Sequence, residues 1–294
     1  MKRIAVVGSI NIDYFVESNK LPKFGETVMG NNFFMDLGGK GANQAVAVAR
    51  LGGDVTLFGS IGNDEQRVLL INHFQNEKVG IDHLNVVEGV STGAAFIQLF
   101  HSENRIIIVP GANEYTNANY SKKIKNQLLQ YDVFLFQLEI PIETLEFLIP
   151  ILHEHNKTII LDPAPAEKLD KDLLDQVTYL TPNEHEFATV LGHEEKISDT
   201  LIKYPNKVIV TCGEKGVVYH NGNKIVTIPA RKVKAIDTTG AGDTFTGAFT
   251  VAVSKGKPLE ECIQYGVYAA SLSVMKKGAQ AGMPFHDQLE TVEG

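Results

Sequence analysis

Short apolar runs alternate with longer segments of helical spacing along most of this chain. Residues 133–137 and 158–161 are runs of four or five residues rich in Val, Ile, Leu and Phe, a pattern typical of strands buried on both faces. A helical segment, residues 142–155, separates the two runs. This alternation predicts the α/β class, with a central, mostly parallel sheet between two layers of helices in a three-layer sandwich.

The same pattern continues on either side of these elements. Further strands are expected at residues 4–7, 54–60, 177–180 and 207–211, and a small hairpin at 216–220 and 224–228. Further helices are expected at residues 41–51, 64–77, 184–191, 241–255 and 259–275. Because no repeat or linker interrupts the pattern, we expect a single domain over residues 1–294.

Two stretches depart from this alternation and read as hairpins. Residues 27–29 and 33–35 flank Gly30-Asn31-Asn32, and residues 93–100 and 105–109 flank the polar stretch 101–104. We expect the segments at about 11–36 and 93–109 to form a separate small sheet. A small sheet beside an α/β body is a candidate lid over a binding site.

The composition excludes several classes of partner. The chain has 27 Lys and Arg against 35 Asp and Glu, a formal net charge of −8, which argues against nucleic acid or an anionic membrane surface. No run approaches the ~18 apolar residues of a membrane span. The two cysteines, Cys212 and Cys262, are far apart without metal-like neighbours, which favours a reducing cytoplasm.

The segment from Asp237 to Gly247 (DTTGAGDTFTG) is the strongest candidate site. Its glycines precede an apolar helix, and a helix N-terminus with close backbone N–H groups binds anions. Asp243 lies inside this anion hole, where a carboxylate would repel a phosphate unless it removes a proton from an attacking hydroxyl. The alternative is an aspartate that caps the helix. The segment matches neither the Walker A loop nor the dinucleotide-binding fingerprint.

Two polar clusters could bind a sugar. In Gly38-Gly39-Lys40-Gly41-Ala42-Asn43, the glycines allow close approach and Asn43 could bond neighbouring hydroxyls; the alternative is a tight turn with a solvated lysine. Asn11 and Asp13 follow the first strand and, two residues apart, share one side of an extended chain. Their alternative is a capping turn. Glu139, after the strand at 133–137, could reach a sugar hydroxyl or be a loop-end charge.

Two further segments could serve a nucleotide. Asn183 and Glu186 share one face at a helix start, where their oxygens suit a water-rich Mg²⁺ site near phosphates. The same pattern fits a capping box equally well. Residues 211–216, Thr-Cys-Gly-Glu-Lys-Gly, follow a strand and could wrap phosphates or simply turn into the hairpin.

Together these motifs resemble the ribokinase-type sugar kinases, known as the PfkB family of carbohydrate kinases. The resemblance runs nearly end to end through GSINID (8–13), GGKGANQA (38–45), STGAAFI (91–97), GAN (111–113), QLE (137–139), DPAPA (162–166), TPNE (181–184), VTCGEKG (210–216), DTTGAGDTF (237–245) and KKGAQ (276–280). GGKGANQA, GAN, LDPAPA and KGAQ are more similar to the ribose-phosphorylating branch than to fructokinases or adenosine kinases.

The resemblance implies transfer of the ATP γ-phosphate to the 5-hydroxyl of D-ribose, with Asp243 as base. The implied anion hole is Gly240, Ala241 and Gly242. The implied ribose ligands are Asn11, Asp13, Gly39, Lys40, Gly41, Ala42, Asn43, Glu139 and Asp243. The implied nucleotide ligands are Asn183, Thr211, Cys212, Gly213, Glu214, Lys215, Gly216 and Gly242, with Glu186 aiding Mg²⁺. The implied K⁺ ligands are Asp237, Thr239, Ser273, Lys276, Gly278 and Gly282. The resemblance also implies a homodimer formed through the lid sheet.

The sequence departs from the family pattern at three places, one of which is the stretch 192–205, which is shorter than in the family. Three alternatives to the implied function also stay open. Gly282 stands where a serine is common, and Val267 where an Asn or His often faces the nucleotide. The alternatives are a related kinase for fructose or a nucleoside, a non-catalytic sugar-binding regulator, and a nicotinamide oxidoreductase. The retained Asp243 and its glycines disfavour the regulator, and the missing fingerprint disfavours the oxidoreductase.

Overall fold

The central sheet of the computed structural model, which describes residues 1–100, 103–191 and 196–290, has five parallel strands in the order β11-β10-β9-β1-β4. They are β1 (Ile4–Val7), β4 (Val55–Phe58), β9 (Val133–Phe136), β10 (Thr158–Leu161) and β11 (Tyr179–Leu180). A parallel bridge from Leu180 to Val208 leads into an antiparallel sheet of β12 (Ile209–Thr211), β13 (Val217–His220) and β14 (Ile225–Ile228). The mostly parallel sheet predicted from the sequence is confirmed.

Both faces of the central sheet are covered, because alternate residues of each strand enter different hydrophobic cores. In β1, Ile4 and Val6 pack in one core, whereas Ala5 and Val7 pack in the other. The first core includes residues of α1 (Lys40–Arg50), α2 (Gln66–Asn76), α8 (Ala241–Ser254) and α9 (Leu259–Ser273). The second includes residues of α3 (Ala118–Leu128), α4 (Ile142–Glu154), α5 (Lys171–Gln176), α6 (Glu184–Leu191) and α7 (Ile197–Lys203). The predicted three layers are therefore present.

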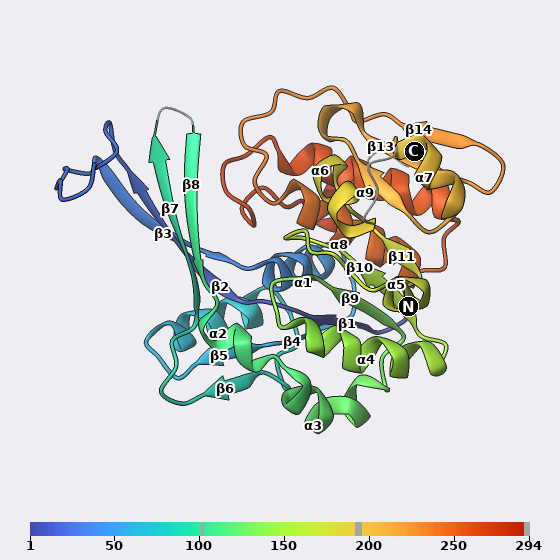
Figure 1. Ribbon diagram of the computed structural model, residues 1–294, viewed down its shortest axis with the longest axis horizontal. Helices are drawn as coiled ribbons and strands as arrows, with labels where there is room; N and C mark the ends of the chain where they lie inside the picture. The colour runs from blue at the N-terminus through green and yellow to red at the C-terminus, as the bar shows by residue number, and fades with distance from the viewer. Residues whose placement is uncertain (101–102, 192–195, 291–294) are drawn as a thin grey trace.

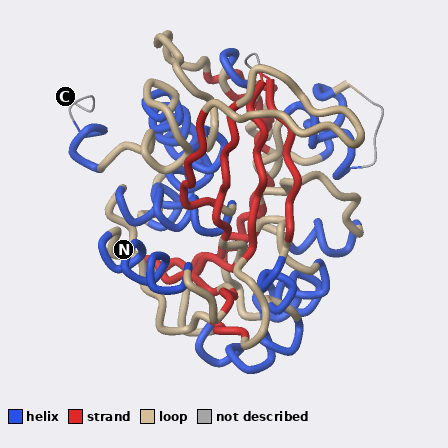
Figure 2. The backbone as a smooth tube through the Cα atoms, turned by 90° about the vertical axis from the view of Figure 1, so that its left-hand side faces the viewer, coloured by secondary structure: helices blue, strands red, loops and turns tan. Residues whose placement is uncertain are grey.

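A second, four-stranded sheet projects from this body (Figures 1 and 2). Its order is β3-β2-β7-β8, built from β2 (Asn11–Glu17), β3 (Asn32–Gly38), β7 (Gly93–Phe100) and β8 (Glu103–Val109). The predicted turn of the β7–β8 hairpin falls partly on residues 101–102, which lie outside the described residues. One face of this sheet is apolar and exposed; its large exposed side chains include Phe33, Met35, Phe96 and Ile107.

The hairpin expected at residues 27–29 and 33–35 is wrong. Residues 27–29 form no strand, and β3 instead pairs with β2 in an antiparallel register from Asn11 opposite Gly38 to Glu17 opposite Asn32. A partner strand of seven residues satisfies far more backbone groups than a three-residue run can, so the chain from 18 to 31 becomes the connection.

The remaining elements are short. Strands β5 (Ser60–Gly62) and β6 (Asn85–Val87) form a two-stranded parallel sheet. The single-turn helices are η1 (Gly111–Tyr115), η2 (Gly213–Lys215) and α10 (His286–Glu290). Within the described ranges, no helix has the length and apolarity needed to cross a membrane.

Candidate active site

The first turn of α8 holds Asp243 against the start of α1. Gly240 is the N-cap residue of α8, with a left-handed φ of 74°. A β-carbon at this position would lie 2.9 Å from the Cα atom of Ala279, so a glycine is required both by conformation and by space. The predicted anion-hole residues Gly240, Ala241 and Gly242 therefore lie at a helix N-terminus, where N–H groups lack intrahelical partners.

The carboxylate of Asp243 is buried, with a 6% exposed fraction, and both of its oxygens accept side-chain hydrogen bonds. Asn43 Nδ2 donates to Oδ2 over 2.9 Å, and Gln44 Nε2 donates to Oδ1 over 3.0 Å. The helix has no side-chain cap. The alternative reading of Asp243 as a helix-capping residue is therefore wrong.

Gln44 joins Asp243 to a second buried carboxylate, Asp162. Its Nε2 atom also donates to Asp162 Oδ2 over 2.6 Å, and its Oε1 atom accepts from Gln137 Nε2 over 2.6 Å. Burial raises the pKa of Asp162 to about 7, and the negative charges of Asp243 and Glu186 act in the same direction, against Lys40 and the Gln44 hydrogen bond.

Lys40 balances this concentration of negative charge. Burial alone would lower the pKa of its ammonium, but the carboxylates of Asp243, Asp162 and Glu139 raise it further than burial lowers it. Glu139 itself ties two segments together, because its Oε2 atom accepts from Ser9 Oγ over 2.5 Å and from the Lys40 amide over 2.9 Å. Glu139 thus lies in the loop after β9, with its carboxylate bonded to the segments at 8–13 and 38–45.

Asn11 and Asp13 lie in β2, so the alternative reading of a capping turn is wrong for both. Asn11 Oδ1 accepts from Asn113 Nδ2 over 2.7 Å, which links β2 to the GAN motif. Burial raises the pKa of Asp13 to about 7, and the charges of Glu139, Asp36 and Asp243 contribute in that order. These electrostatic partners place Asp13 in the same cluster as the α8 carboxylate.

Asn183 and Glu186 form the capping box that the sequence left open. Asn183 Oδ1 accepts from the amides of His185 and Glu186, each over 2.8 Å, and Glu186 Oε2 accepts from the Asn183 amide over 2.9 Å. Although both residues cap the helix, Glu186 also lies close enough to the Asp243 cluster to act on it. Its charge raises the pKa of both Lys40 and Asp162.

Residues 211–216 form a closed turn beside these caps. Thr211 pairs with Asn183 in a parallel bridge, and the Cys212 amide donates to the Gly216 carbonyl over 2.7 Å. Lys215 Nζ lies 3.5 Å from Glu184 Oε1. The structure therefore brings the two predicted nucleotide segments together, although they are separate in the sequence.

The segments that the resemblance assigns to K⁺ are joined through Asp237. Its Oδ1 atom accepts from the Thr239 amide over 2.9 Å and from Thr239 Oγ1 over 2.7 Å, and its Oδ2 atom accepts from the Gly278 amide over 2.9 Å. Partial burial opposes ionisation, but these hydrogen bonds and Lys277 lower the pKa of Asp237 overall. Within residues 1–100, 103–191 and 196–290, no group of three or more His, Cys, Asp or Glu side chains could hold a metal ion.

Sequence reasoning assigned no role to four buried polar residues of this site: Gln44, Gln137, Asp162 and Gln280. All four lie within the motifs of the family resemblance. The available signal was a polar residue inside a segment expected to be buried, as with Gln44 in the Ala- and Val-rich helix. Buried polar groups need partners, so such residues could have been expected to bond one another.

The comparisons with known proteins agree over nearly the whole chain. Residues 1–286 match the model of the "pfkB family carbohydrate kinase". Ribokinase of Bacillus subtilis is 44% identical over 290 residues, which cover 99% of both chains. The structure of ribokinase from Thermotoga maritima has a TM-score of 0.88 at 39% identity, covering 99% of both chains. That of Arabidopsis thaliana ribokinase complexed with ribose and ATP has a TM-score of 0.91 at 33% identity, covering 99% of this chain and 98% of that one.

Proposed function

Because the chain belongs to the pfkB family of carbohydrate kinases, we propose that it transfers the γ-phosphate of ATP to the 5-hydroxyl of D-ribose, giving D-ribose 5-phosphate and ADP. The observation that carries this proposal is the placement of Asp243. Its two oxygens are held by Asn43 and Gln44 at the N-terminus of α8 and are not used to cap that helix. A positioned carboxylate beside an anion hole suits proton abstraction from an alcohol that attacks a phosphate.

In this mechanism Asp243 accepts the proton of the ribose 5-hydroxyl as its oxygen attacks the γ-phosphorus. The backbone N–H groups of Ala241 and Gly242, with the partial positive charge at the start of α8, offset the negative charge on the transferring group. Lys40 contributes a fixed positive charge on the sugar side, supported by its raised pKa.

The ribose would lie between β2 and the start of α1. We assign its hydroxyls to the side chains and backbone of Asn11, Asp13, Gly39, Lys40, Gly41, Ala42, Asn43 and Glu139. Gly39 supports this assignment. Its φ of 87° favours glycine, and a β-carbon there would lie 2.8 Å from the Asn11 amide nitrogen and 2.9 Å from the Ile10 Cα atom, so only a glycine lets the start of α1 lie this close to β2.

The ATP phosphates would run from the start of α8 toward the turn at 211–216 and Asn183. Glu186 suits an indirect contribution to Mg²⁺, since its charge already acts within the carboxylate cluster. When bound, Mg²⁺ neutralises charge on the phosphates of the nucleotide. The adenine side at Val267 differs from the family pattern, so no side-chain hydrogen bond to the base is assigned there.

The residues present also fit a K⁺ ion beside the anion hole. Asp237 has a lowered pKa and joins the loops at 237–240 and 276–282, so a carboxylate that favours its ionised form lies between the two loops. We assign K⁺ to Asp237, Thr239, Ser273, Lys276, Gly278 and Gly282, the last through its backbone alone. The ion would supply a fixed positive charge near the start of α8.

The projecting sheet would act as a lid and as a dimer interface. Its exposed apolar face, with Phe33, Met35 and Phe96, supports a homodimer in which two such sheets cover each other. We also propose a cytoplasmic location, which the two unpaired, buried cysteines support.

The test is release of ADP in a coupled assay with D-ribose, other pentoses, D-fructose and nucleosides, each with and without K⁺. We expect kcat/KM to be highest for D-ribose and to rise when K⁺ is added. A higher kcat/KM for D-fructose or a nucleoside would assign the chain to another branch of the family. No ADP release with any acceptor would favour the non-catalytic regulator.

A further inference from the structure

Asn43, which donates to Asp243, is itself held from the other side by Gln280. Gln280 Nε2 donates to Asn43 Oδ1 over 2.9 Å, although 237 residues separate the two in the chain. The Oε1 atom of Gln280 lies 2.7 Å from His73 Nε2 on α2. Asn43 and Gln280 are buried, with exposed fractions of 7% and 4%. A row of three side chains therefore ends on the carboxylate of Asp243.

The direction of every hydrogen bond in this row follows from its last member. An ionised carboxylate only accepts, so Asn43 must turn its NH₂ group toward Asp243 and its Oδ1 atom toward Gln280. Gln280 must then present its own NH₂ group to Asn43 and its Oε1 atom to His73. Because an amide oxygen only accepts, the Nε2 atom of His73 must carry a hydrogen.

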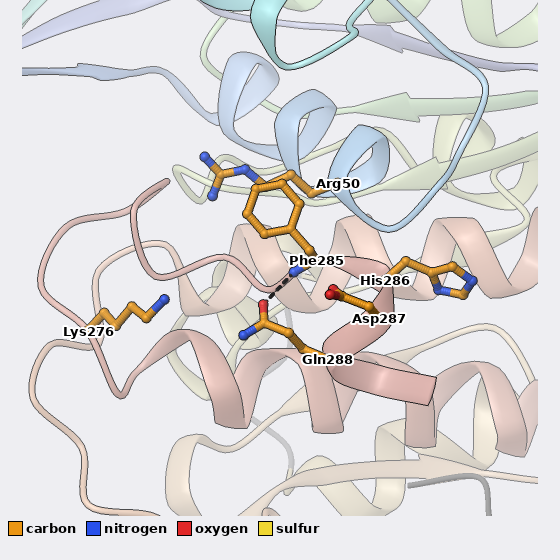
Figure 3. Close-up of a pocket in the computed structure, with 6 residues that line it drawn as sticks. All are labelled: Arg50, Lys276, Phe285, His286, Asp287 and Gln288. Carbon is orange, nitrogen blue, oxygen red and sulfur yellow. Dashed lines mark hydrogen bonds between the residues drawn. The ribbon is translucent and has the colours of Figure 1, made fainter. Parts of the chain in front are cut away.

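The backbone of Gln280 is fixed to the same helix that carries Asn43. Arg50, at the end of α1, donates through Nη1 to the carbonyl groups of Gln280 and Met283, the latter over 3.2 Å. Glu77 holds the Arg50 guanidinium with bonds of 2.7 and 2.8 Å. Figure 3 shows Arg50 beside the ring of Phe285, whose centroid is 4.9 Å from the guanidinium carbon. The Gln280 side chain therefore starts from a fixed position.

We propose that Gln280 is a positioning residue for the phosphoryl transfer, because it orients the amide of Asn43 so that Nδ2 faces Asp243. His73 orients Gln280 in the same way. If the side-chain amide of Asn43 turned by half a rotation, its Oδ1 atom would face the carboxylate of Asp243. The partial negative charge of that oxygen and the carboxylate would then repel each other. This inference rests on the proposed function, in which Asp243 is the base.

A double-mutant cycle tests whether Gln280 acts through Asn43. Gln280→Met keeps the length of the side chain and removes both polar ends, and we expect kcat to fall by about tenfold to a hundredfold, as for a misplaced catalytic group. In an Asn43→Ala background the same substitution should change kcat by less than about twofold, since the group to be oriented is absent. Equal fold-losses in both backgrounds would overturn the proposal. Gln75→Met, at an exposed position of α2, is the matched control and should leave kcat unchanged.

A second measurement needs no catalysis. The measurement is the NMR spectrum of the ring nitrogens in ¹⁵N-histidine-labelled protein at about pH 8.5, where an ordinary imidazole is neutral. The signals of His73 are identified by their absence from the spectrum of His73→Phe, and we expect them to show the Nε2–H tautomer. An Nδ1–H tautomer would reverse the whole row and overturn the proposal. Because the tautomer does not depend on turnover, a protein that fails to phosphorylate ribose but shows Nε2–H would contradict the proposed function and leave the orientation of Asn43 standing.

Discussion

The Nδ2 atom of Asn43 lies 2.9 Å from the Oδ2 atom of Asp243, although 200 residues separate the two in the chain. The bond joins the first turn of α1 to the first turn of α8. Two glycine-rich helix starts that are far apart in the sequence therefore form one site.

Gln44 is expected to stabilise the fold because it serves two buried carboxylates at once. Gln44→Leu removes the donor to Asp162 and Asp243, and we expect the free energy of unfolding to fall by about 1–3 kcal/mol or more. Urea unfolding at neutral pH measures the change. Gln75→Leu, on the exposed side of α2, is the control. Equal unfolding free energies for the two variants would contradict the role of Gln44.

Asp13 is expected to make stability depend on pH. Its pKa is about 7 in the folded protein, against an ordinary value of 3.8, so the folded state binds the proton more tightly. The contribution of this group to folding therefore becomes less favourable as the pH rises from about 4 to about 7. We expect the Tm of Asp13→Asn, measured relative to that of the unchanged protein, to increase with pH across that range. Above about pH 7 the difference in Tm should become constant. A Tm difference between Asp13→Asn and the unchanged protein that stays constant from about pH 4 to about pH 7 would contradict this role of Asp13.

Gly282 has no room for a side chain. A β-carbon there would lie 2.3 Å from the carbonyl oxygen of Ser273, a main-chain atom that cannot move aside cheaply. We expect Gly282→Ala to destabilise the protein by about 1–3 kcal/mol. Gly242→Ala is the contrast, because its β-carbon would meet no atom of the described residues within 4 Å, and the helical site should gain roughly 0.5–1 kcal/mol. Urea unfolding that ranked the two variants in the opposite order would show that the loop at 276–282 has another conformation.

Cys212 and Cys262 are expected to be unreactive in the folded protein. Burial raises the pKa of each thiol to about 11, with Glu184 adding to the effect at Cys212 and Glu261 at Cys262. Since the thiolate is the reactive form, maleimide labelling at about pH 8 should be slow for both and fast in urea. Labelling of either folded thiol at the rate of free cysteine is the contrary result.

Much of the fold follows from local sequence signals. The apolar runs locate the strands of the central sheet, and the predicted 158–161 and 184–191 coincide with β10 and α6. Helix α3 was not predicted, because its sequence ANYSKKIKNQL is mostly polar and buries only one face. The pairing of β2 with β3 was not predicted either, because a 14-residue connection carries no turn signal that fixes a register.

The site was predictable in its parts and not in its connections. The glycines indicated helix starts, and Asp243 stood out as a carboxylate in an anion hole. The bonds from Gln44 to Asp162 and from Gln280 to Asn43 span 118 and 237 residues, and no local pattern specifies such pairs. The reciprocal bonds of Asn183 and Glu186, by contrast, are local and matched one of the two interpretations that the sequence allowed.

The most direct measurement compares turnover and nucleotide binding in Asp243→Asn. The substitution keeps the size of the side chain, but it removes the group that accepts the proton. We expect kcat with D-ribose and ATP to fall by about 10²–10⁴-fold, the usual contribution of a general base, while the Kd for ATP changes by less than about threefold. Turnover close to that of the unchanged protein, with ATP bound as tightly, would contradict the assignment of Asp243 as the base.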